Sequence, residues 1–146
     1  MGPYAIAQHR HAPEIEQELS IAAKTEITVN FTPHLIPMSR GELVTCYARL
    51  TNSHSAEDCR ETLQQQYRND SFVDLSPEHI YPQTQFVRGS NRVMLNAYTD
   101  RIKGRVILVA ALDNLIKGSA GQALQNFNLM SDYRETTGLE QIALFP

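Results

Sequence analysis

Two imidazoles and one guanidinium stand at three consecutive positions near the amino-terminus, at His9, Arg10 and His11. Imidazole gains and loses protons near neutral pH, so either histidine could act as a general acid or base. The guanidinium of Arg10 could hold a carboxylate or a phosphate through two parallel hydrogen bonds. The triplet predicts a site where a negatively charged substrate meets a proton-transferring side chain, whereas the alternative interpretation is a polar surface loop.

The residues that follow the triplet predict a helix over about residues 13–23. Pro13 suits the first helical position, where its missing N–H costs no hydrogen bond. Three glutamates, of which Glu14 is the first, lie in the opening turns, where carboxylates meet the positive end of the helix dipole. Ile15 and Leu19 stand four residues apart and form one apolar edge. We therefore expect the triplet to lie just before a helix N-terminus, which is a place that binds anions.

The other side chains that could do chemistry give weaker signals. The two histidines of the triplet could face one metal ion, but two ligands leave a zinc site incomplete, and nothing fixes the distance of His34 as a third, so no metal site is predicted. Arg40 precedes a predicted strand and is a second candidate clamp for a carboxylate or phosphate, the alternative being a solvated arginine. Cys46 lies mid-strand and Cys59 lies on an apolar helix face, so both are predicted to be small buried hydrophobic side chains rather than nucleophiles.

The whole chain has the size and composition of one ordinary domain. Its 146 residues are 42% hydrophobic and carry a formal net charge of −3, with a pI near 5.9, which gives no basic surface for nucleic acid. No apolar run approaches the ~20 residues needed to span a bilayer, and the first residues lack the pattern of a signal peptide. We therefore expect a soluble, cytoplasmic protein of a single domain, 1–146, that binds neither nucleic acid nor membrane.

The elements that must position the candidate residues are strands joined in hairpins, with helices between them. Strands are predicted over 26–32, 42–50, 72–75, 86–89, 93–98 and 105–112, and helices over 13–23, 56–68 and 119–130, with Ser55 as an N-cap. The run at 105–112 is the most apolar and is predicted to be a central strand with helices on both faces. Gly104 should close a hairpin before it, since glycine can take a positive φ. This order predicts an α+β fold, a mostly antiparallel mixed sheet covered by helices.

Three features of this predicted fold point to contacts outside the chain. A sheet with hairpin edges must be covered or paired, so self-association is expected. The last helix opens with four small residues, 118–121, which would let another group approach free N–H donors. Residues 1–8 resemble the end of a strand whose partners come from elsewhere, so we expect the chain to be part of a larger fold.

Three long segments of the chain resemble N-acetyl-γ-glutamyl-phosphate reductases. They are HRHAPEIEQEL at 9–19, FTPHLIPMSRG at 31–41 and DNLIKGSAGQALQNFNLM at 113–130, and the tail with ETTGL at 135–139 fits as well. The match runs from about residue 4 to the end, in the family's order. The resemblance implies the family's carboxy-terminal catalytic and dimerisation domain, an α+β fold similar to that of the aspartate-semialdehyde and glyceraldehyde-3-phosphate dehydrogenases.

In this family, a cysteine thiolate attacks an acyl phosphate, phosphate leaves, and NADPH delivers a hydride to the thioester, which yields N-acetylglutamate semialdehyde for arginine biosynthesis. The resemblance places the NADP-binding Rossmann domain and the Pro-Gly-Cys nucleophile motif before this chain. It therefore implies a portion of the enzyme that is inactive alone, with NADP bound mainly by the absent domain, and that forms a homodimer or tetramer. Two alternatives stay open: a non-catalytic assembly or binding domain of the same fold, and a related acyl-phosphate reductase of lysine biosynthesis.

Carried over position by position, the resemblance assigns roles to eight residues. The catalytic acid/base is His9 or His11, with His9 favoured. The residues that border the substrate carboxylate and phosphate are Arg10, Glu14 and Arg40. The residues near the nicotinamide are Asn114, Lys117 and Gly118.

Overall fold

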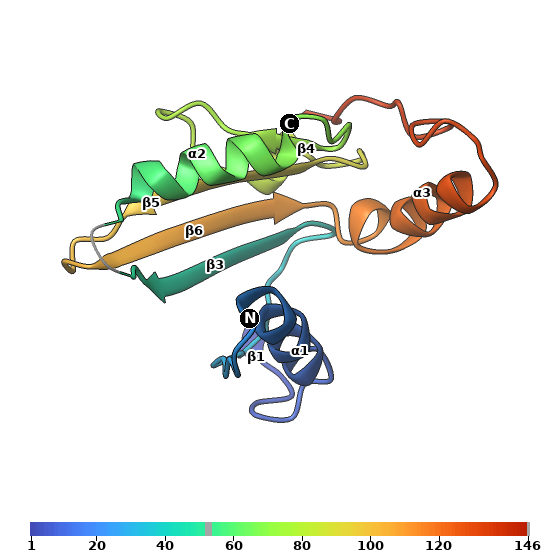
Figure 1. Ribbon diagram of the computed structural model, residues 1–146. Coiled ribbons are helices and arrows are strands. Elements are labelled where there is room, and N and C mark those ends of the chain that lie inside the picture. Colours follow the sequence, from blue (N-terminus) through green and yellow to red (C-terminus); the bar gives the residue numbers. More distant parts are fainter. Residues whose placement is uncertain (52–53, 146) are drawn as a thin grey trace. The chain divides into compact units, whose positions relative to one another are not determined.

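The computed structural model describes residues 1–51 and 54–145, which separate into two compact units. The first unit is Met1–Ser39, and the second begins at Arg40 and runs to the carboxy-terminus (Figure 1). The single domain expected for 1–146 stays a prediction.

The first unit is built on helix α1, His11–Ala23, which follows strand β1, Gly2–Pro3. Strand β1 pairs antiparallel with β2, His34–Leu35. The predicted helix is confirmed, but it begins two residues before Pro13, so this proline takes the third helical position rather than the first. The first turn tolerates proline there because the N–H groups of that turn have no partner inside the helix.

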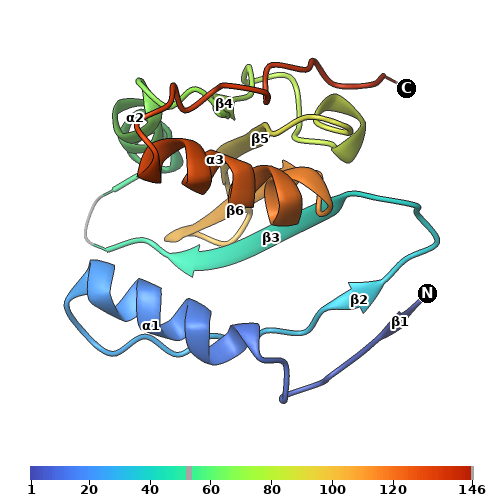
Figure 2. The same ribbon diagram turned by 90° about the vertical axis from the view of Figure 1, so that its right-hand side faces the viewer.

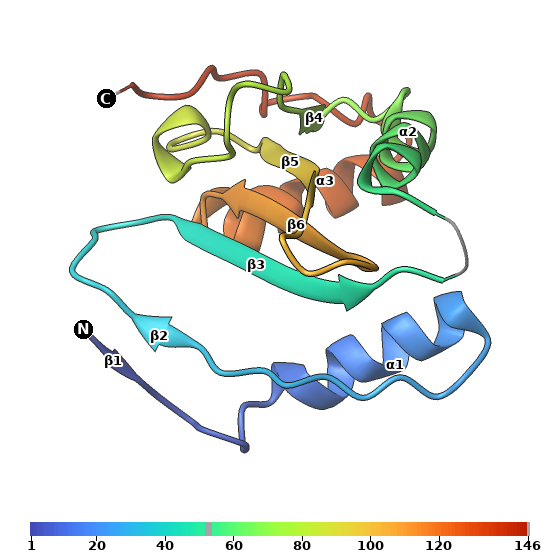
Figure 3. The same cartoon turned by 90° about the vertical axis from the view of Figure 1, so that its left-hand side faces the viewer.

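The strand predicted over 26–32 is wrong. This segment lies along α1 without strand pairing (Figure 3). Its backbone N–H groups bind helix side chains instead: Ile27 N donates to Ser20 Oγ at 2.9 Å, and Val29 N donates to Glu16 Oε1 at 3.0 Å. The alternation of apolar residues therefore reflects an extended segment packed on a helix.

The second unit contains a four-stranded sheet in the order β3–β6–β5–β4. Its strands are β3 Glu42–Arg49, β4 Val73–Leu75, β5 Val93–Thr99 and β6 Arg105–Leu112. The β3–β6 and β6–β5 pairs are antiparallel, and the β5–β4 pair is parallel. Gly104 closes the β5–β6 hairpin with a φ of 78°. The predicted α+β fold with a mostly antiparallel mixed sheet is confirmed.

Helix α2, Ala56–Tyr67, covers one face of this sheet (Figures 1 and 2). It begins with a capping box, in which Ser55 Oγ accepts from Asp58 N at 3.1 Å and Asp58 Oδ2 accepts from Ser55 N at 2.7 Å. The core beneath it is formed by Ala56 of the helix and by Ala97 and Val106 of the two inner strands. The predicted N-cap and helix are therefore confirmed.

Strand β6 has the inner position that its sequence predicts, but it is not buried on both faces. Most of its residues are half-buried, with Val106 and Ala111 the buried ones. Strand β3 is more open, since Tyr47 and Leu43 on the face away from α2 are 69% and 55% exposed. Cys46, predicted to be buried, is exposed as well, because α2 packs on β4, β5 and β6.

Two further elements differ from the sequence prediction. The strand expected at 86–89 is a 3₁₀-helix, η1 Thr84–Phe86, followed by a turn in which Gly89 has a φ of 78°. The last helix, α3 Gly121–Met130, begins after one π-helical turn, η2 Ile116–Ala120. The predicted turn at 51–55 includes residues 52 and 53, which lie outside the described part of the chain.

Candidate functional site

In the first unit, the ring of His9 lies in a cluster of aromatic side chains. The ring centroids of Tyr4 and Phe31 are each 5.3 Å away, and that of His11 is 4.7 Å away. His9 Nδ1 accepts a hydrogen bond from the backbone N–H of His11 at 3.2 Å. A neutral imidazole that accepts at Nδ1 carries its proton at Nε2. The cluster therefore presents an Nε2–H donor.

The other candidates of this unit lie within one helical turn of His9. Arg10 is the N-cap of α1, His11 is its first residue, and Glu14 lies in its first turn; all three are exposed. Sequence reasoning missed Tyr4 and Phe31 as partners of His9, and the only signal for them was their place in short apolar patterns.

The anion-binding N-terminus predicted for α1 is not available through its first backbone donors. His11 N donates to His9 Nδ1, and Ala12 N donates to the carbonyl oxygen of His9 at 3.0 Å. Pro13, the third helical residue, has no N–H to offer. An anion at this place would therefore have to be held by the side chains of the triplet.

In the second unit, Arg40 and the 113–118 segment come together around Asp113. A guanidinium nitrogen of Arg40 donates to Asp113 Oδ2 at 3.3 Å, and Gly89 N donates to the same oxygen at 2.7 Å. The other carboxylate oxygen, Oδ1, accepts from Leu115 N at 2.9 Å and from Ile116 N at 3.1 Å. One carboxylate thus joins a predicted substrate-binding residue to the segment predicted to meet the cofactor.

Asp113 is fully buried, and its charge is maintained by these partners. Burial by itself raises the pKa of the carboxyl group, but the backbone N–H groups of Gly89, Leu115 and Ile116 and the charge of Arg40 outweigh it and lower the pKa below its usual value. The sequence signal for Asp113 was available: an aspartate directly after a buried strand and before a helix is a favoured N-cap.

The three residues predicted to contact the cofactor differ in how many of their polar groups already have partners within the chain. Asn114 Oδ1 accepts from Gly41 N at 2.7 Å, and Gly118 is exposed, although its N–H donates to the carbonyl oxygen of Asp113 at 3.0 Å. Lys117 Nζ donates to Gln125 Oε1 at 2.8 Å and lies 5.5 Å from the centroid of the Phe72 ring. Burial of Lys117 lowers the pKa of its amine, against the raising effect of two nearby carboxylates.

The small residues 118–121 offer fewer free N–H donors than the sequence predicts. The N–H groups of Ala120 and Gly121 donate to the carbonyl oxygens of Leu115 and Ile116. The N–H groups of Leu115 and Ile116 bind the Asp113 carboxylate, and that of Gly118 binds its carbonyl. Gly121 instead serves close packing. A Cβ atom there would press on Asn91 Oδ1 and lie 2.6 Å from Ile116 Cγ2 and 2.8 Å from Ile116 O.

Neither cysteine of the chain has the properties of a nucleophile. Although Cys46 as a residue is exposed, partial desolvation of its thiol raises the pKa, and burial together with the charge of Asp58 raises the thiol pKa of Cys59. A thiol with a raised pKa has less of the reactive thiolate at neutral pH. The nucleophile that the resemblance implies is therefore neither of these two side chains.

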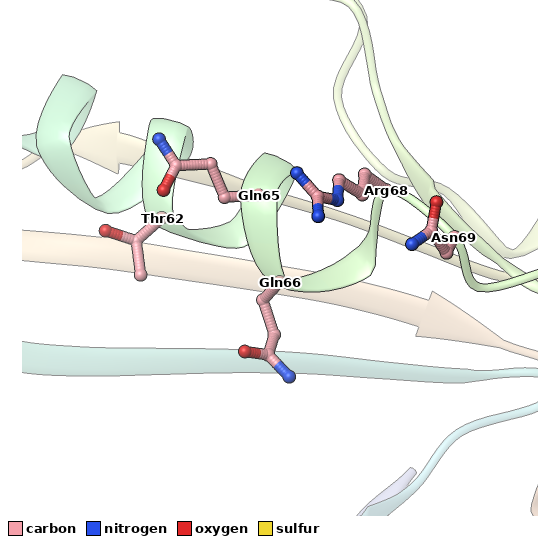
Figure 4. A pocket seen from close by; sticks show the side chains of 5 residues that line it. All are labelled: Thr62, Gln65, Gln66, Arg68 and Asn69. Carbon is pink, nitrogen blue, oxygen red and sulfur yellow. The ribbon is translucent and has the colours of Figure 1, made fainter.

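Other features of the described residues do not form a second site. No three His, Cys, Asp or Glu side chains among residues 1–51 and 54–145 gather closely enough to hold a metal ion. No helix in the same ranges has the length and apolar character to cross a bilayer. A hollow of about 460 Å³ on α2 is lined by five polar side chains that point in different directions (Figure 4), namely Thr62, Gln65, Gln66, Arg68 and Asn69. It contains none of the candidate residues.

The arrangement of sheet and helices defines a class of protein. The fold is similar to that of aspartate semialdehyde dehydrogenase II from Vibrio cholerae, with a TM-score of 0.59 and 17% sequence identity over 86% of this chain and 38% of that one. Residues 1–114 match the family described as semialdehyde dehydrogenase, dimerisation domain. The chain belongs to this family.

Closer relatives share one name. The chain is 48% identical over 98% of its length to an N-acetyl-gamma-glutamyl-phosphate reductase of Rhodospirillum rubrum, and 49% identical over 100% of its length to one of Moorella thermoacetica. A probable chloroplastic reductase of the same name from Arabidopsis thaliana is 47% identical over 98% of the chain. These matches confirm the resemblance seen in the sequence. The chain covers 41%, 42% and 36% of these three proteins.

Proposed function

We propose that this chain is the carboxy-terminal, substrate-binding and dimerisation portion of an NADPH-dependent N-acetyl-γ-glutamyl-phosphate reductase of arginine biosynthesis, which acts in the cytoplasm. The observation that carries the proposal is the 48–49% identity, over nearly the whole chain, to two bacterial reductases of that name. In this proposal the nucleophilic cysteine and the NADP-binding Rossmann domain belong to a segment outside these 146 residues, and the chain alone does not turn over substrate.

The first unit would supply the proton in this reaction. His9 would act as the general acid in its imidazolium form, in which Nδ1 no longer accepts from His11 N, and its Nε2–H would donate a proton to the oxygen that becomes the aldehyde. Its neighbours Tyr4 and Phe31 would restrict the ring to one orientation. Arg10 and Glu14, both exposed at the start of α1, would border the charged groups of the substrate.

Arg40 would bind the phosphate or carboxylate of the substrate in the second unit. Its side chain is 31% exposed and gives Asp113 one contact at 3.3 Å. A guanidinium has five N–H donors, so it can hold Asp113 and an anion at once. Because the pKa of Asp113 is lowered, the carboxylate that orients Arg40 stays ionised at neutral pH.

The 114–118 segment would lie against the nicotinamide end of NADPH, which supplies the hydride when bound. Asn114 uses its Oδ1 for Gly41 N, so its amide nitrogen can still donate to a carboxamide oxygen. Gly118 is exposed and has no side chain to keep a flat ring at a distance. Lys117 fits less directly, because its amine is held by Gln125, and it would stiffen the segment.

Self-association would use the open side of the sheet, consistent with the family's description as a dimerisation domain. Tyr47 and Leu43 expose large apolar surfaces on β3, which is an edge strand of the four-stranded sheet. Edge strands and exposed apolar faces are commonly covered by a second subunit. We propose a homodimer or tetramer on this basis. The same observation favours the second candidate function, an assembly domain without catalytic residues.

A chimeric enzyme tests the proposed function. The 146 residues would replace the matching 42% of the Moorella thermoacetica reductase, so that the rest of that protein supplies the missing part of the enzyme. NADPH formation from N-acetylglutamate semialdehyde, phosphate and NADP is then followed by absorbance. We expect turnover by the chimera and none by the chain alone.

Two variants test His9 as the acid/base. His9→Ala should lower kcat by roughly 10²–10⁴-fold, whereas His34→Ala, an exposed histidine of the same unit outside the ring cluster, should retain activity. A folded chimera that binds NADPH but does not turn over this substrate would refute the reductase and favour the assembly domain. Preference for the semialdehyde one carbon longer would favour the lysine-pathway reductase.

A further inference from the structure

The carboxy-terminal tail contacts the turn that holds Asp113. Leu144 N donates to the carbonyl oxygen of Arg88 at 2.7 Å, and the Phe145 ring stacks on Phe86 at 6.1 Å with an interplanar angle of 7°. Two views show the tail running past the η1 turn (Figures 2 and 3). The tail is therefore docked on residues 86–89 of the second unit.

Gly89 links the docked tail to the buried carboxylate. A Cβ atom on Gly89 would lie 2.8 Å from Leu144 Cδ1, so the leucine side chain packs directly on the glycine. The N–H of Gly89 makes a 2.7 Å bond to Asp113 Oδ2, the oxygen that also binds Arg40. Leu144, Gly89, Asp113 and Arg40 thus form one continuous line of contacts.

We propose that Asp113 is a positioning residue of the substrate site, and that Leu144 and Phe145 hold it in place through Gly89. The proposal deepens the proposed function, because it rests on Arg40 as the anion-binding residue. Asp113 Oδ2 sets the direction of the Arg40 guanidinium, and Oδ1 holds the segment with Asn114 and Gly118. When the tail is displaced, the hydrogen bond from Gly89 to Asp113 weakens. The Arg40 guanidinium and the 114–118 segment, which both bind Asp113, are then held less firmly.

The geometry indicates why the tail should matter at this point. The Gly89 bond is the shortest of the four to the Asp113 carboxylate, and the Arg40 contact is the longest. A buried carboxylate that loses a donor must find another. We expect it to draw on the Arg40 guanidinium or on solvent, so that the guanidinium turns away from the anion.

Amide hydrogen exchange of the 146-residue chain tests the line of contacts without reference to activity. The double variant Leu144→Ala/Phe145→Ala should reduce protection of the Gly89, Leu115 and Ile116 amides by about tenfold, the equivalent of one charge-assisted hydrogen bond. The matched control is Ile142→Ala, at a residue of the same tail that is 82% exposed. Unchanged protection in the double variant, or an equal loss in the control, would overturn the proposal.

Kinetics of the chimera test the consequence for the site. The double variant should raise the KM for phosphate by about tenfold with a smaller change in kcat, because the anion-binding group is misdirected. Asp113→Asn should raise the KM for phosphate further. Asp113→Glu keeps a carboxylate and should bring this KM part of the way back to the parent value. An unchanged KM for phosphate, despite reduced amide protection, would overturn the positioning role. A chimera without any turnover would refute the proposed function, and the exchange experiment would then still decide whether the tail holds Asp113.

Discussion

Replacing Gly121 with alanine tests the packing that sets the start of α3. Gly121 is buried, and its φ of −67° is helical, so alanine meets no backbone strain there. The added Cβ would press on Asn91 Oδ1 and lie 2.6 Å from Ile116 Cγ2 and 2.8 Å from Ile116 O. Because one of these atoms belongs to the backbone and Asn91 is fully buried, the overlap cannot be relieved by rotating one flexible side chain.

The expected change in the free energy of unfolding of Gly121→Ala follows from two opposing effects. Alanine is favoured over glycine inside a helix by about 1 kcal/mol, whereas overpacking a tight site costs roughly 1–3 kcal/mol or more. With three atoms closer than contact distance, we place the overlap at the upper end, so Gly121→Ala should lower the free energy of unfolding by about 2 kcal/mol. Gly118→Ala is the matched substitution. Its Cβ would lie 3.3 Å from the end of the Leu112 side chain and at an ordinary contact distance of 3.7 Å from Asn114 Cβ and Asp113 O, so the change should stay within about 1 kcal/mol.

Urea denaturation followed by far-ultraviolet circular dichroism measures both variants. With a typical slope of about 1–3 kcal/mol per molar urea, Gly121→Ala should move the midpoint down by about 1 M, and Gly118→Ala should leave it nearly unchanged. In the chimera, Gly118→Ala should raise the KM for NADP, since its methyl group occupies the predicted nicotinamide contact. Equal stability of Gly121→Ala and the parent would refute the close packing of Gly121 on Asn91 and Ile116.

Three further predictions follow from the second unit. Ser55→Ala should lower the unfolding free energy by about 1 kcal/mol through loss of the capping box, and an unchanged urea midpoint would contradict this. Because folding lowers the pKa of Asp113, its contribution to stability is present above the ordinary carboxyl pKa of about 3.9 and is lost as the pH falls through the lower folded value. The stability gap between parent and Asp113→Asn should therefore narrow in acid, and a constant gap in urea titrations would refute that. Tyr47→Glu should weaken self-association in light scattering, whereas Thr62→Glu on α2 should not; equal effects would exclude the β3 face as the interface.

The second unit could largely be predicted because its signals are local. Gly104 lies between two apolar runs and closes a hairpin, and Ser55 with Asp58 three residues later marks a helix start. These features act within a few residues and are independent of what covers the sheet. The exposure of Cys46 could not be predicted, because it depends on which strands α2 covers rather than on the strand pattern itself.

The errors arose where one pattern fits two structures. Alternating Ile27, Val29 and Phe31 suit a strand, but they suit equally an extended segment on a helix whose Ser20 and Glu16 accept the free backbone donors. The segment forms a strand only where a partner strand lies beside it. This depends on the rest of the fold and not on the residues of the segment.

The sequence names residues for the candidate site, and these stay predictions, but it could not predict the contacts between them. Arg40 and Asp113 are 73 positions apart in sequence, so only the fold could bring them into contact. The resemblance predicts roles for Arg40 and Asn114, but it gave no role to Asp113. The charged state of Asp113 is inferred from the four groups that donate to its carboxylate, since a charge at 0% exposure requires such compensation.

The first unit raises a different question, which is what holds His9 in place. None of the residues in Met1–Ser39, all of which the structure describes, is buried. A segment of this size without a buried core gains little from the hydrophobic effect, and chains below about 40 residues seldom fold alone. The contacts within Met1–Ser39 alone therefore give the ring cluster of His9 with Tyr4 and Phe31 little stability. The proposed proton-transfer role of His9 is therefore to be measured in the chimera and not in a peptide of the first unit.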